Sequence, residues 1–500
     1  MGIFFQTRDF KQINLIMNDD QIYQKLVKIC GSKFVSNKNE LLEEYSSDLS
    51  FVEGLKPKYI VWTKRGNQIE KILKLANNIG FSIIPVSSSS PIRYHGDTVP
   101  LRDNCIILDL SKMNKVLNID RNNRVVMVEP GVSFGQIFPL LKKKGLRLLI
   151  PLLPRDSKSV LTSALERVPT TIPRYQWDSS DPLMCTEVVF GTGDLFRTGT
   201  AAGPGTIKQQ QKSGQAQVNP MGPTQFSPFR LIQGAQGSLG IVTWATLKLE
   251  LLPTISKVIH LQSENLQDLL NLQQQLLKYR LGDELVILNN INLACLLRMQ
   301  PQDIEELSKS LDKWNLILIL AGRGILAEDK IKYQEGDFND IMRNLNLDHL
   351  KRESVINEDE IIKALNSSTP NPWRRRLKES FQDIFFITNY ERIFDFVTMV
   401  ENEISYDLGI YIQAINQGTS YHCEFNLFYN LEDKEILNKK FIELSIKLMD
   451  KGAFFNRPYS FWAKEVFKRH EESTQIALRK VKKIFDPNNV LNPGVLCFDD

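Results

Sequence analysis

The sequence predicts an α+β fold in which the strands pair in a mixed or antiparallel way. A strand–helix–strand unit at 58–86 would by itself favour a doubly wound Rossmann domain. The segments that follow exclude that fold, because 105–129 and 186–198 have the pattern of short strands joined by turns, and 240–251 ends in strict apolar and charged alternation. The GxGxxG fingerprint of dinucleotide-binding Rossmann domains is also missing from the chain.

The elements of the first half can be placed in order from their periodicity. Residues 1–50 are predicted to be helical, with Asn18 and Asn37 as N-caps, and Gly80 is predicted to end the next helix. The remaining elements are expected as helices at 67–78 and 134–144 and as strands at 58–62, 82–86, 105–110, 124–129, 146–150, 186–190, 195–198 and 240–251.

The second half has a different composition, which predicts a separate domain. After Pro253 the chain is richer in Leu, Gln, Asp and Lys, with helices and short strands alternating to about residue 455. The segment 485–494 is again dense in turn-forming residues and predicts a shaped loop. We therefore expect four parts, namely 1–54, 55–253, 254–454 and a C-terminal segment, 455–500, that returns to the second part.

Composition and charge exclude several classes of protein. A net charge of +4 over 500 residues does not favour nucleic-acid binding. The 6 cysteines are isolated and the 5 histidines are scattered, so we expect no metal site and no disulfide framework. The longest apolar run, 316–320, is too short to span a bilayer, and the N-terminus lacks a signal-peptide pattern, so a cytoplasmic protein is predicted. The run 374–376 of three arginines is interpreted as a solvated helix face or a single anion contact.

Four consecutive serines, Ser87–Ser90, follow the strand predicted at 82–86. Their hydroxyl and backbone N–H groups could hold an anionic group such as a pyrophosphate in a tight loop. A polar surface turn is the alternative interpretation of the same residues.

Six segments, in this order along the chain, resemble the vanillyl-alcohol oxidase and p-cresol methylhydroxylase superfamily of FAD-linked oxidoreductases. The resemblance implies a flavoprotein with a PCMH-type FAD-binding domain of two α+β subdomains at 55–253, and a substrate (cap) domain with an antiparallel sheet flanked by helices at 254–454. The matching segments are 84–100, 106–114, 128–132, 187–199, 232–243 and 485–494.

The resemblance also implies which residues contact the cofactor. Serines replace most glycines of the family's pyrophosphate loop, which keeps backbone donors and adds hydroxyls. Gly237 and Gly240 would allow the backbone to approach the cofactor closely, although turn formation is an alternative role for both. The serine next to the loop, where some members carry a histidine linked to FAD, favours non-covalent binding over attachment through His95 or His422. The expected contacts are Val86, Ser87, Ser88, Ser89, Ser90, Pro91, Pro130, Gly131, Pro154, Ser159, Gln236, Gly237, Gly240, Ile241, Val242 and Asn492.

The catalytic residues are expected in the second half. A strand predicted at 421–429 places His422 and Glu424 on one face, where His422 is the expected base, although a solvent-facing strand side is the alternative. Arg457 and Tyr459 lie where the family holds a phenolate or a carboxylate, although Arg457 could instead form an interdomain salt bridge.

The activity that the resemblance implies is that of a dehydrogenase or oxidase. It transfers a hydride from a C–H bond of a 2-hydroxy acid or related alcohol to flavin N5. Two alternatives stay open, namely oxidation of a phenolic or aryl-alkyl substrate and a role as the flavin subunit of a larger redox complex. An iron–sulfur or other electron-acceptor subunit and a second copy of the chain are the partners to consider, since no cysteine cluster exists in this chain.

Overall fold

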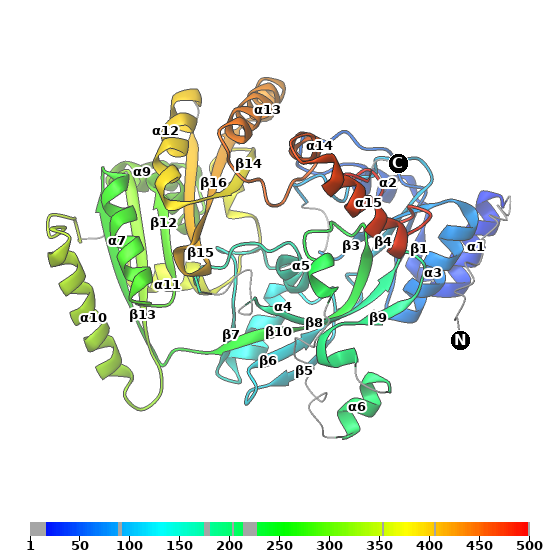
Figure 1. Ribbon diagram of the computed structural model, residues 1–500, viewed down its shortest axis with the longest axis horizontal. Helices are drawn as coiled ribbons and strands as arrows, with labels where there is room; N and C mark the ends of the chain where they lie inside the picture. The colour runs from blue at the N-terminus through cyan, green and yellow to red at the C-terminus, as the bar shows by residue number, and fades with distance from the viewer. Residues whose placement is uncertain are drawn as a thin grey trace.

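The computed structural model describes residues 17–88, 93–174, 181–202, 205–213, 228–352, 355–404 and 407–498. Three sheets organise these residues (Figure 1). The two sheets of the first half stand on the right of the figure and the sheet of the second half on the left, with β10 (Gly240–Leu251) leading from one to the other. The predicted α+β class is therefore confirmed.

The first sheet has four strands and carries helices on both faces. Its order is β1-β2-β4-β3, with β2, β4 and β3 parallel and β1 antiparallel. Side chains of α1 and α3 pack on one face, and those of α2 on the other. The elements are α1 (Asp19–Cys30), β1 (Val35–Ser36), α2 (Asn39–Ser46), β2 (Tyr59–Trp62), α3 (Gly66–Ile79), β3 (Ser82–Val86) and β4 (Cys105–Asp109).

Of the three helix ends predicted for this part, two are confirmed. Asn18 caps α1, since its side chain accepts a hydrogen bond from the backbone N–H of Gln21. Gly80 ends α3 in a left-handed conformation with φ 71°. The prediction for Asn37 was wrong, because the N-cap of α2 is Lys38, one residue later in the chain.

The second sheet is antiparallel, and it contains a strand that the sequence analysis missed. Its order is β5-β6-β10-β8-β9, and β7 also pairs with β10. The segment between the strands expected at 105–110 and 124–129 is itself a strand, β5, which pairs with β6. The strand expected at 105–110 therefore belongs to the first sheet, as β4, and the one expected at 124–129 belongs to the second, as β6. The elements are β5 (Val116–Asp120), β6 (Val125–Val128), α4 (Phe134–Lys142), β7 (Leu146–Leu148), α5 (Val160–Leu165), β8 (Leu183–Phe190), β9 (Leu195–Arg197), α6 (Ile207–Ser213) and β10.

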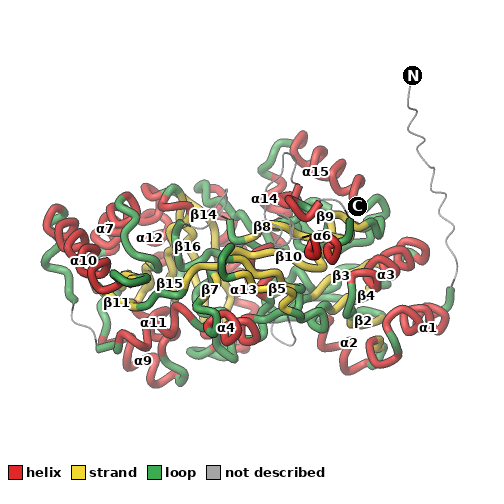
Figure 2. The backbone as a smooth tube through the Cα atoms, turned by 90° about the horizontal axis from the view of Figure 1, so that it is seen from below, coloured by secondary structure: helices red, strands yellow, loops and turns green. Residues whose placement is uncertain are grey.

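The third sheet is antiparallel throughout, in the order β11-β13-β12-β15-β16-β14. Helices cover both faces, so its strands are buried almost along their whole length (Figure 2). The elements are β11 (Ile255–Ser263), α7 (Leu266–Lys278), β12 (Leu285–Asn289), α8 (Asn290–Leu297), α9 (Pro301–Ser310), β13 (Trp314–Gly322), α10 (Ala327–Asn344), α11 (Glu358–Asn366), β14 (Ser380–Thr388), α12 (Ile393–Glu403), β15 (Leu408–Ile415), β16 (Ser420–Tyr429) and α13 (Lys434–Asp450).

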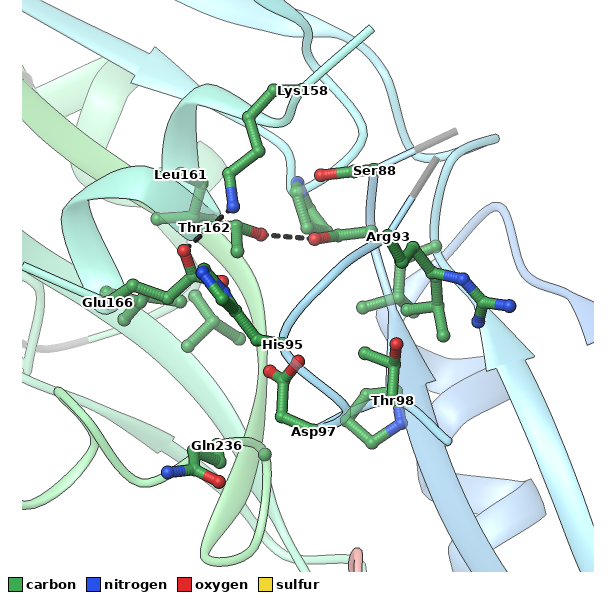
Figure 3. Close-up of a pocket in the computed structure, with 18 of the residues that line it drawn as sticks. Ser88, Arg93, His95, Asp97, Thr98, Lys158, Leu161, Thr162, Glu166 and Gln236 are labelled. Atoms are coloured by element: carbon green, nitrogen blue, oxygen red, sulfur yellow. Dashed lines mark hydrogen bonds and ion pairs between the residues drawn. The ribbon is translucent and has the colours of Figure 1, made fainter. Parts of the chain in front are cut away.

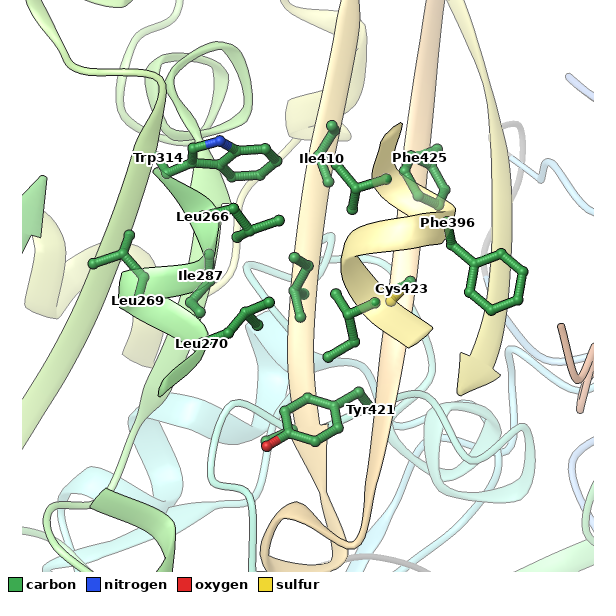
Figure 4. Packing of buried hydrophobic residues seen from close by; sticks show 14 of the residues in the cluster. Leu266, Leu269, Leu270, Ile287, Trp314, Phe396, Ile410, Tyr421, Cys423 and Phe425 are labelled. Carbon is green, nitrogen blue, oxygen red and sulfur yellow. The ribbon is translucent and has the colours of Figure 1, made fainter. Parts of the chain in front are cut away.

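The largest hydrophobic cluster lies between this sheet and the helices α7, α10, α12 and α13. Figure 4 shows leucines of α7 meeting Ile287 of β12 and Trp314 of β13, while Phe396 of α12 meets Phe425 of β16. Successive residues of β12 point to opposite faces, because Leu285 and Ile287 belong to this cluster and the residues that follow each of them belong to the cluster under α8, α9 and α11. The predicted antiparallel sheet flanked by helices is thus confirmed.

The C-terminal part returns to the first sheet. α14 (Phe461–Lys468) and α15 (Glu472–Phe485) lie beside β3 and β4 in Figure 1, and Leu491 pairs with Ile83 of β3. The proposed division at 253 falls between β10 and β11, and the one at 454 falls on a residue that still pairs with Ile387 of β14. In the described ranges, no helix has both the length and the apolar character that a bilayer crossing requires.

Candidate cofactor and substrate site

The first of two adjoining cavities, about 1160 Å³ including its mouth, opens beside the end of β3 (Figure 3). Apolar side chains of β3, α5 and β10 form much of its surface, and hydroxyl, amide and charged groups form the rest. Its lining comprises Pro85, Val86, Ser87, Ser88, Arg93, Tyr94, His95, Asp97, Thr98, Leu110, Pro130, Arg155, Lys158, Leu161, Thr162, Leu165, Glu166, Ile232, Gly234, Gln236, Gly237, Gly240, Ile241, Val242, Arg457 and Tyr459.

The described serines of the loop are tied to the beginning of α5. The hydroxyls of Ser87 and Thr162 are hydrogen-bonded to each other, and the Ser88 hydroxyl accepts a hydrogen bond of 3.0 Å from the backbone N–H of Ser159. Ser159 is the N-cap of α5, and its hydroxyl donates to the carbonyl oxygen of Pro130 at 2.6 Å. The hydroxyls of Ser87, Ser88 and Thr162 therefore line one end of the cavity, where hydroxyl donors suit an anionic group.

The glycines of the segment 234–240 also line the first cavity. The space available for a side chain differs from one of them to the next. A Cβ on Gly237 would meet the Pro85 ring at 2.5 Å, and one on Gly240 would meet the Val188 side chain at 2.5 Å. A Cβ on Gly234 would have nothing within 4 Å, since it would project into open space. The close approach expected at Gly237 and Gly240 is thus made to protein atoms, which matches the alternative of turn and strand-entry packing.

The side chain of Asn492 joins two other loops to the C-terminal tail, next to this cavity. Its amide donates to the carbonyl oxygens of Asp97 at 2.8 Å and Gln236 at 2.7 Å, and its backbone N–H donates to the carbonyl oxygen of Ile83. The side-chain amide of Gln236 in turn donates to the carbonyl oxygen of Pro458 at 2.9 Å. Gln236 Oε1 is buried at the cavity, and no described residue is its hydrogen-bond partner. A ligand N–H or O–H group would satisfy it.

A buried lysine fixes the same tail to the segment that carries Gln236. Lys482 Nζ donates to the carbonyl oxygens of Ser238 at 2.6 Å and Leu491 at 2.8 Å, and it forms an ion pair with Asp486 at 2.6 Å. The Asp486 carboxylate also accepts hydrogen bonds from two backbone N–H groups of the tail. The loop predicted at 485–494 is therefore a hydrogen-bonded clasp on the wall of the first cavity.

The second cavity, about 790 Å³ including its mouth, continues from the first. Six residues line both, which places the junction between them: Tyr94, His95, Arg155, Lys158, Glu166 and Arg457. The remaining lining comes from the loop after β7, from the turn before β14 and from the third sheet, as Pro151, Leu152, Leu153, Pro154, Ser163, Val168, Pro169, Pro372, Trp373, Arg374, Asp383, Phe385, Tyr411 and Glu424.

His95 stands at the junction between aromatic rings. Its imidazole is stacked on Tyr459 with ring centroids 4.4 Å apart and an interplanar angle of 7°, and Tyr94 meets it edge-on. Among the described residues, its ring nitrogens have no hydrogen-bond partner. Burial, together with the positive charges of Lys158 and Arg457, lowers the pKa of His95 well below its ordinary value, so the imidazole is neutral.

Charged groups surround His95 on the side of the first cavity. Lys158 donates to Glu166 at 2.7 Å, so the two form a partly buried ion pair. Although burial opposes it, the Glu166 carboxylate raises the pKa of Lys158, which therefore remains protonated. Burial raises the pKa of Asp97 to about 7, and Glu166 adds to this rise. Asp97 can therefore gain or lose a proton near neutral pH.

Arg457 is buried at the junction, and none of the described residues is its counter-ion. Its side chain is 6% exposed, and it lies over the ring of Phe385, with the ring centroid 4.2 Å from Cζ. Within the described ranges, its guanidinium has no hydrogen-bond or ion-pair partner, and its Nε is fully buried. The interdomain salt bridge considered for Arg457 is thus not formed with any described residue. A buried unpaired guanidinium costs free energy unless an anion joins it.

Glu424, one of the expected catalytic residues, is saturated by neighbours. Its Oε1 accepts hydrogen bonds from Arg374 Nε at 2.8 Å and from Asn426 Nδ2 at 2.8 Å, and its Oε2 lies 3.2 Å from His422 Nε2. Although burial alone would raise the pKa of Glu424, Arg374 and His422 lower it well below its usual range, so the carboxylate is ionised. Its role in this arrangement is to hold the Arg374 guanidinium.

His422 lines neither cavity. It is 1% exposed, its Nε2 faces Glu424, and its ring packs against the rings of Phe385 and Tyr411. Burial lowers the pKa of His422, so it is a neutral partner of Glu424. The strand and the shared face predicted for 421–429 are present, but the face points to a buried polar network and not to solvent, and of the two expected catalytic residues on it Glu424 alone also lines the second cavity.

Asp383 completes this network from the neighbouring strand β14. Its Oδ1 accepts a hydrogen bond of 2.7 Å from Asn426 Nδ2, and its Oδ2 lies 3.8 Å from Arg374 Nε. Burial, with the Glu424 carboxylate close by, raises the pKa of Asp383 to about 7. Because Asp383 lines the second cavity, its charge near neutral pH acts on any ligand bound there.

The structure brings together most of the residues that the sequence indicated for the cofactor. Of the remaining ones, Ser89, Ser90 and Pro91 lie outside the described residues. Pro154 lines the second cavity and not the first. Gly131, Ser159 and Asn492 line neither cavity, and Gly131 is needed because a Cβ would lie 2.6 Å from the carbonyl oxygen of Ser111. Those that line the first cavity are Val86, Ser87, Ser88, Pro130, Gln236, Gly237, Gly240, Ile241 and Val242, and two of the expected catalytic residues, Arg457 and Tyr459, line it as well.

Sequence reasoning missed most of the junction and of the second cavity. Lys158 and Glu166 flank α5, and the Ser159 cap was the one local signal for that helix. Arg374 had been interpreted within a run of three arginines, yet it is buried over the Trp373 ring at 4.1 Å and paired with Glu424. Asp383 had no signal at all, because its neighbours in space come from another strand.

Comparisons with known proteins agree with the fold and with the first cavity. Residues 57–198 match the family model of the FAD binding domain. The flavoprotein subunit of 4-cresol dehydrogenase [hydroxylating] from Pseudomonas putida is 27% identical over 187 residues, which cover 37% of this chain and 35% of that protein. D-lactate dehydrogenase from Anaerostipes hadrus is 23% identical over 486 residues, covering 92% of this chain and 94% of that protein.

A solved structure has the same overall fold. The crystal structure of p-cresol methylhydroxylase with substrate bound superposes with a TM-score of 0.79 at 19% identity, over 96% of this chain and 97% of that chain. The match to the 4-cresol dehydrogenase subunit spans only 35% of that protein. The match to another relative, the mitochondrial D-lactate dehydrogenase [cytochrome] of Arabidopsis thaliana, spans only 32% of that protein.

These matches define the class of protein. The chain contains an FAD-binding domain, and most of the residues that line the first cavity belong to it. More particularly, the chain has the fold of the vanillyl-alcohol oxidase and p-cresol methylhydroxylase superfamily, as the sequence predicted. The residues fit FAD, since donors gather at one end of the cavity, apolar walls suit its rings, Gln236 offers an unpaired acceptor and Gly234 leaves open space.

Proposed function

We propose that the protein is an FAD-linked dehydrogenase or oxidase of a 2-hydroxy acid. The observation that carries this proposal is the buried guanidinium of Arg457, which has no counter-ion among the described residues and faces both cavities. A planar guanidinium donates two parallel hydrogen bonds to a carboxylate. A substrate carboxylate held there would place the neighbouring carbon at the junction of the cavities.

The chain's own residues would bind and orient this substrate. Arg457 would hold the carboxylate. The neutral His95, with ring nitrogens that have no hydrogen-bond partner among the described residues, would accept the proton of the substrate hydroxyl. Tyr459 and Phe385 would exclude water from both groups. FAD bound in the first cavity supplies the acceptor for the hydride that leaves the substrate carbon.

The roles first expected for His422 and Glu424 change in this proposal. Both are proposed as positioning residues, because Glu424 holds Arg374 and His422 holds Glu424. His422 lines neither cavity, and both carboxylate oxygens of Glu424 already have hydrogen-bond partners.

Non-covalent binding of FAD is retained in the proposal. His422 is buried outside the first cavity, and among the histidines of the described ranges only His95 lines it. Its face-on stack with Tyr459 supports a role as a neutral base. Precipitation of the purified protein with acid tests this point, because a non-covalent flavin stays in the supernatant and a linked one sediments with the protein.

The acceptor that reoxidises the flavin is proposed to be a separate molecule. The matched 4-cresol dehydrogenase chain is called a flavoprotein subunit, which supports an electron-acceptor subunit as a partner here. In the described ranges, no cluster of three His, Cys, Asp or Glu residues could hold a metal ion, so an iron–sulfur centre would have to come from that partner. A homo-oligomer is a further possibility that gel filtration tests.

A phenolic substrate is the second candidate, and the rings around Arg457 favour it. Tyr94, His95, Phe385 and Tyr459 form an aromatic cluster beside the guanidinium, which could hold a phenolate. The structural similarity to p-cresol methylhydroxylase supports the same alternative.

Anaerobic reduction of the purified, FAD-loaded protein separates the two candidates. D-2-hydroxy acids and 4-alkylphenols are added separately, and the loss of the oxidised flavin absorbance is followed. We expect bleaching by the hydroxy acids. Bleaching by the alkylphenols alone would replace the first candidate with the second, and bleaching by neither would remove both.

A further inference from the structure

Asp97 presents a carboxyl group to the first cavity (Figure 3). It lies in a turn that follows the serine loop, and hydrogen bonds hold this turn on both sides. The backbone N–H of Gly96 donates to Asp48 Oδ2 at 2.8 Å, and the backbone carbonyl oxygen of Asp97 accepts the hydrogen bond of 2.8 Å from Asn492. The backbone therefore keeps the carboxyl group of Asp97 at the cavity.

This carboxyl group has no counter-ion in the described ranges. It accepts a hydrogen bond from its own backbone N–H, and no other described residue donates to it or forms an ion pair with it. Lys158, whose positive charge favours the ionised form of Asp97, is already paired with Glu166 at 2.7 Å. A half-buried carboxylate without a counter-ion costs free energy, which protonation avoids.

Two acidic groups and one basic group act on Asp97 through their charges. Glu166, the C-cap residue of α5, and Asp48 disfavour its ionised form, whereas Lys158 favours it. Because the charge of Lys158 is largely balanced by Glu166, the negative charge of Asp48 remains. Together with burial, which is the largest effect, these charges raise the pKa of Asp97 to about 7.

The other titratable groups of the first cavity do not balance the charge of Asp97. His95 is neutral because burial lowers its pKa, and burial raises the pKa of Tyr459 well above its ordinary value, so it is neutral too. The Arg93 guanidinium donates to two backbone carbonyl oxygens of the segment 44–47. Within the described structure, no hydrogen bond or ion pair joins Asp97 to the remaining members of the set, which are Tyr94, Arg155 and Arg457.

FAD in the first cavity would act on Asp97 in the same direction as the acidic groups. Its pyrophosphate carries negative charge, and its ring systems would replace water beside the carboxyl group. A neutral carboxyl group can also donate a hydrogen bond to an acceptor atom of the cofactor, whereas a carboxylate can only accept one. Charge, loss of water and hydrogen bonding therefore all favour the protonated form of Asp97 when the cofactor is bound.

We infer that Asp97 takes up a proton when FAD binds, and that the neutral form of this carboxyl group holds the cofactor. At pH values below the pKa of about 7, Asp97 is already protonated, and binding moves no proton. At higher pH, binding requires the uptake of a proton, so FAD affinity falls by up to about 10-fold for each pH unit. The inference concerns the cofactor alone and does not depend on the identity of the substrate.

Dilution of the FAD-loaded protein measures this coupling. The fluorescence of the released flavin gives the dissociation constant of FAD between about pH 6 and about pH 8.5. We expect this constant to rise by about 30-fold over that range, since one proton is taken up and the pKa of Asp97 is about 7. A rise of less than about 3-fold, or no release of flavin at any pH, would overturn the inference. Because no substrate is present, either result would leave the proposed oxidation of a 2-hydroxy acid standing.

A variant without the titrating group locates the proton. Asp97→Asn keeps the shape of the neutral carboxyl group, so its dissociation constant for FAD should vary by less than about 3-fold over the same pH range. Asp103→Asn is the matched control, because Asp103 is exposed, belongs to the same segment and lines neither cavity. It should retain the native pH dependence. A pH dependence that persists in a folded Asp97→Asn protein, as its melting temperature shows, would assign the proton to another group.

Infrared spectroscopy of the native protein tests the same point without a variant. The difference spectrum between the FAD-loaded and the FAD-free protein, at about pH 8, should contain the C=O stretching band of a protonated carboxyl group that appears when FAD binds. The band should be missing from Asp97→Asn and present in Asp103→Asn. Its absence from the native protein would mean that Asp97 stays ionised beside FAD, and the inference would be wrong.

Discussion

The two cavities are built in different ways. The first is made by loops that follow strands, and its polar contacts come largely from backbone groups and short hydroxyl side chains, as with Ser88 and Ser159. The second has charged side chains from a turn and two strands, namely Arg374, Asp383 and Glu424, which pair with one another. A backbone-built site holds one cofactor over many sequences, whereas a side-chain-built site can change its substrate by few substitutions.

Removal of the Arg457 guanidinium should separate the two cavities most clearly. Arg457→Met should slow anaerobic reduction by a 2-hydroxy acid at low concentration by about 1000-fold, because two charge-assisted hydrogen bonds are lost. FAD affinity, measured by quenching of flavin fluorescence, should change little. Arg375→Met is the control, since Arg375 is an exposed arginine, in the run 374–376. Equal losses of FAD affinity and of reduction would show that Arg457 serves the cofactor and not the substrate.

The two buried histidines should differ in their effect on the same reaction. His95→Ala should lower the limiting rate of flavin reduction by about 100-fold, since it removes the proposed proton acceptor. His422→Ala should lower it by less than about 10-fold, because His422 acts only through Glu424. Stopped-flow reduction at saturating substrate measures both. The reverse order would restore His422 as the base.

The clasp formed by the C-terminal tail should affect the first cavity alone. Asn492→Ala removes two hydrogen bonds to buried carbonyl oxygens, so FAD affinity should fall by about 30-fold, at roughly 1 kcal/mol per bond. Asn488→Ala, an exposed neighbour that bonds only to Asn77 in the described structure, should leave FAD affinity unchanged. Titration of the FAD-free proteins with FAD distinguishes the two variants. Equal affinities would mean that the clasp does not shape the cofactor cavity.

The pH dependence of substrate binding should be set in the second cavity. The pKa of Asp383 is raised to about 7, so this carboxyl is neutral below that pH and becomes negatively charged above it. The new charge repels a substrate carboxylate, and affinity should therefore fall by up to about 10-fold as the pH rises from 6 to 8. Asp383→Asn should abolish this fall. Flavin spectral perturbation by a 2-keto acid measures affinity at each pH, and a fall that persists in the variant would assign it to Asp97.

The contrast between the cavities also explains what the sequence could predict. Ser87, Gly237 and Asn492 lie in turn-rich segments whose local composition is informative before any fold is known. The alternation of β16 correctly placed His422 and Glu424 on one face, but alternation does not say what the face meets. That depended on Arg374 and on the neighbouring strand, which pair across 43 to 50 residues of sequence. Long-range pairing of this kind leaves no local pattern.

The clasp of Lys482 and Asn492 also orders events during synthesis. The walls of the first cavity are translated early, but the side chains that hold Ser238 and Gln236 in place lie 244 and 256 residues further along the chain. Domains that depend on a late segment complete their packing only after that segment is available. FAD is therefore loaded after synthesis has passed residue 492, and a nascent chain shorter than this should not retain the flavin.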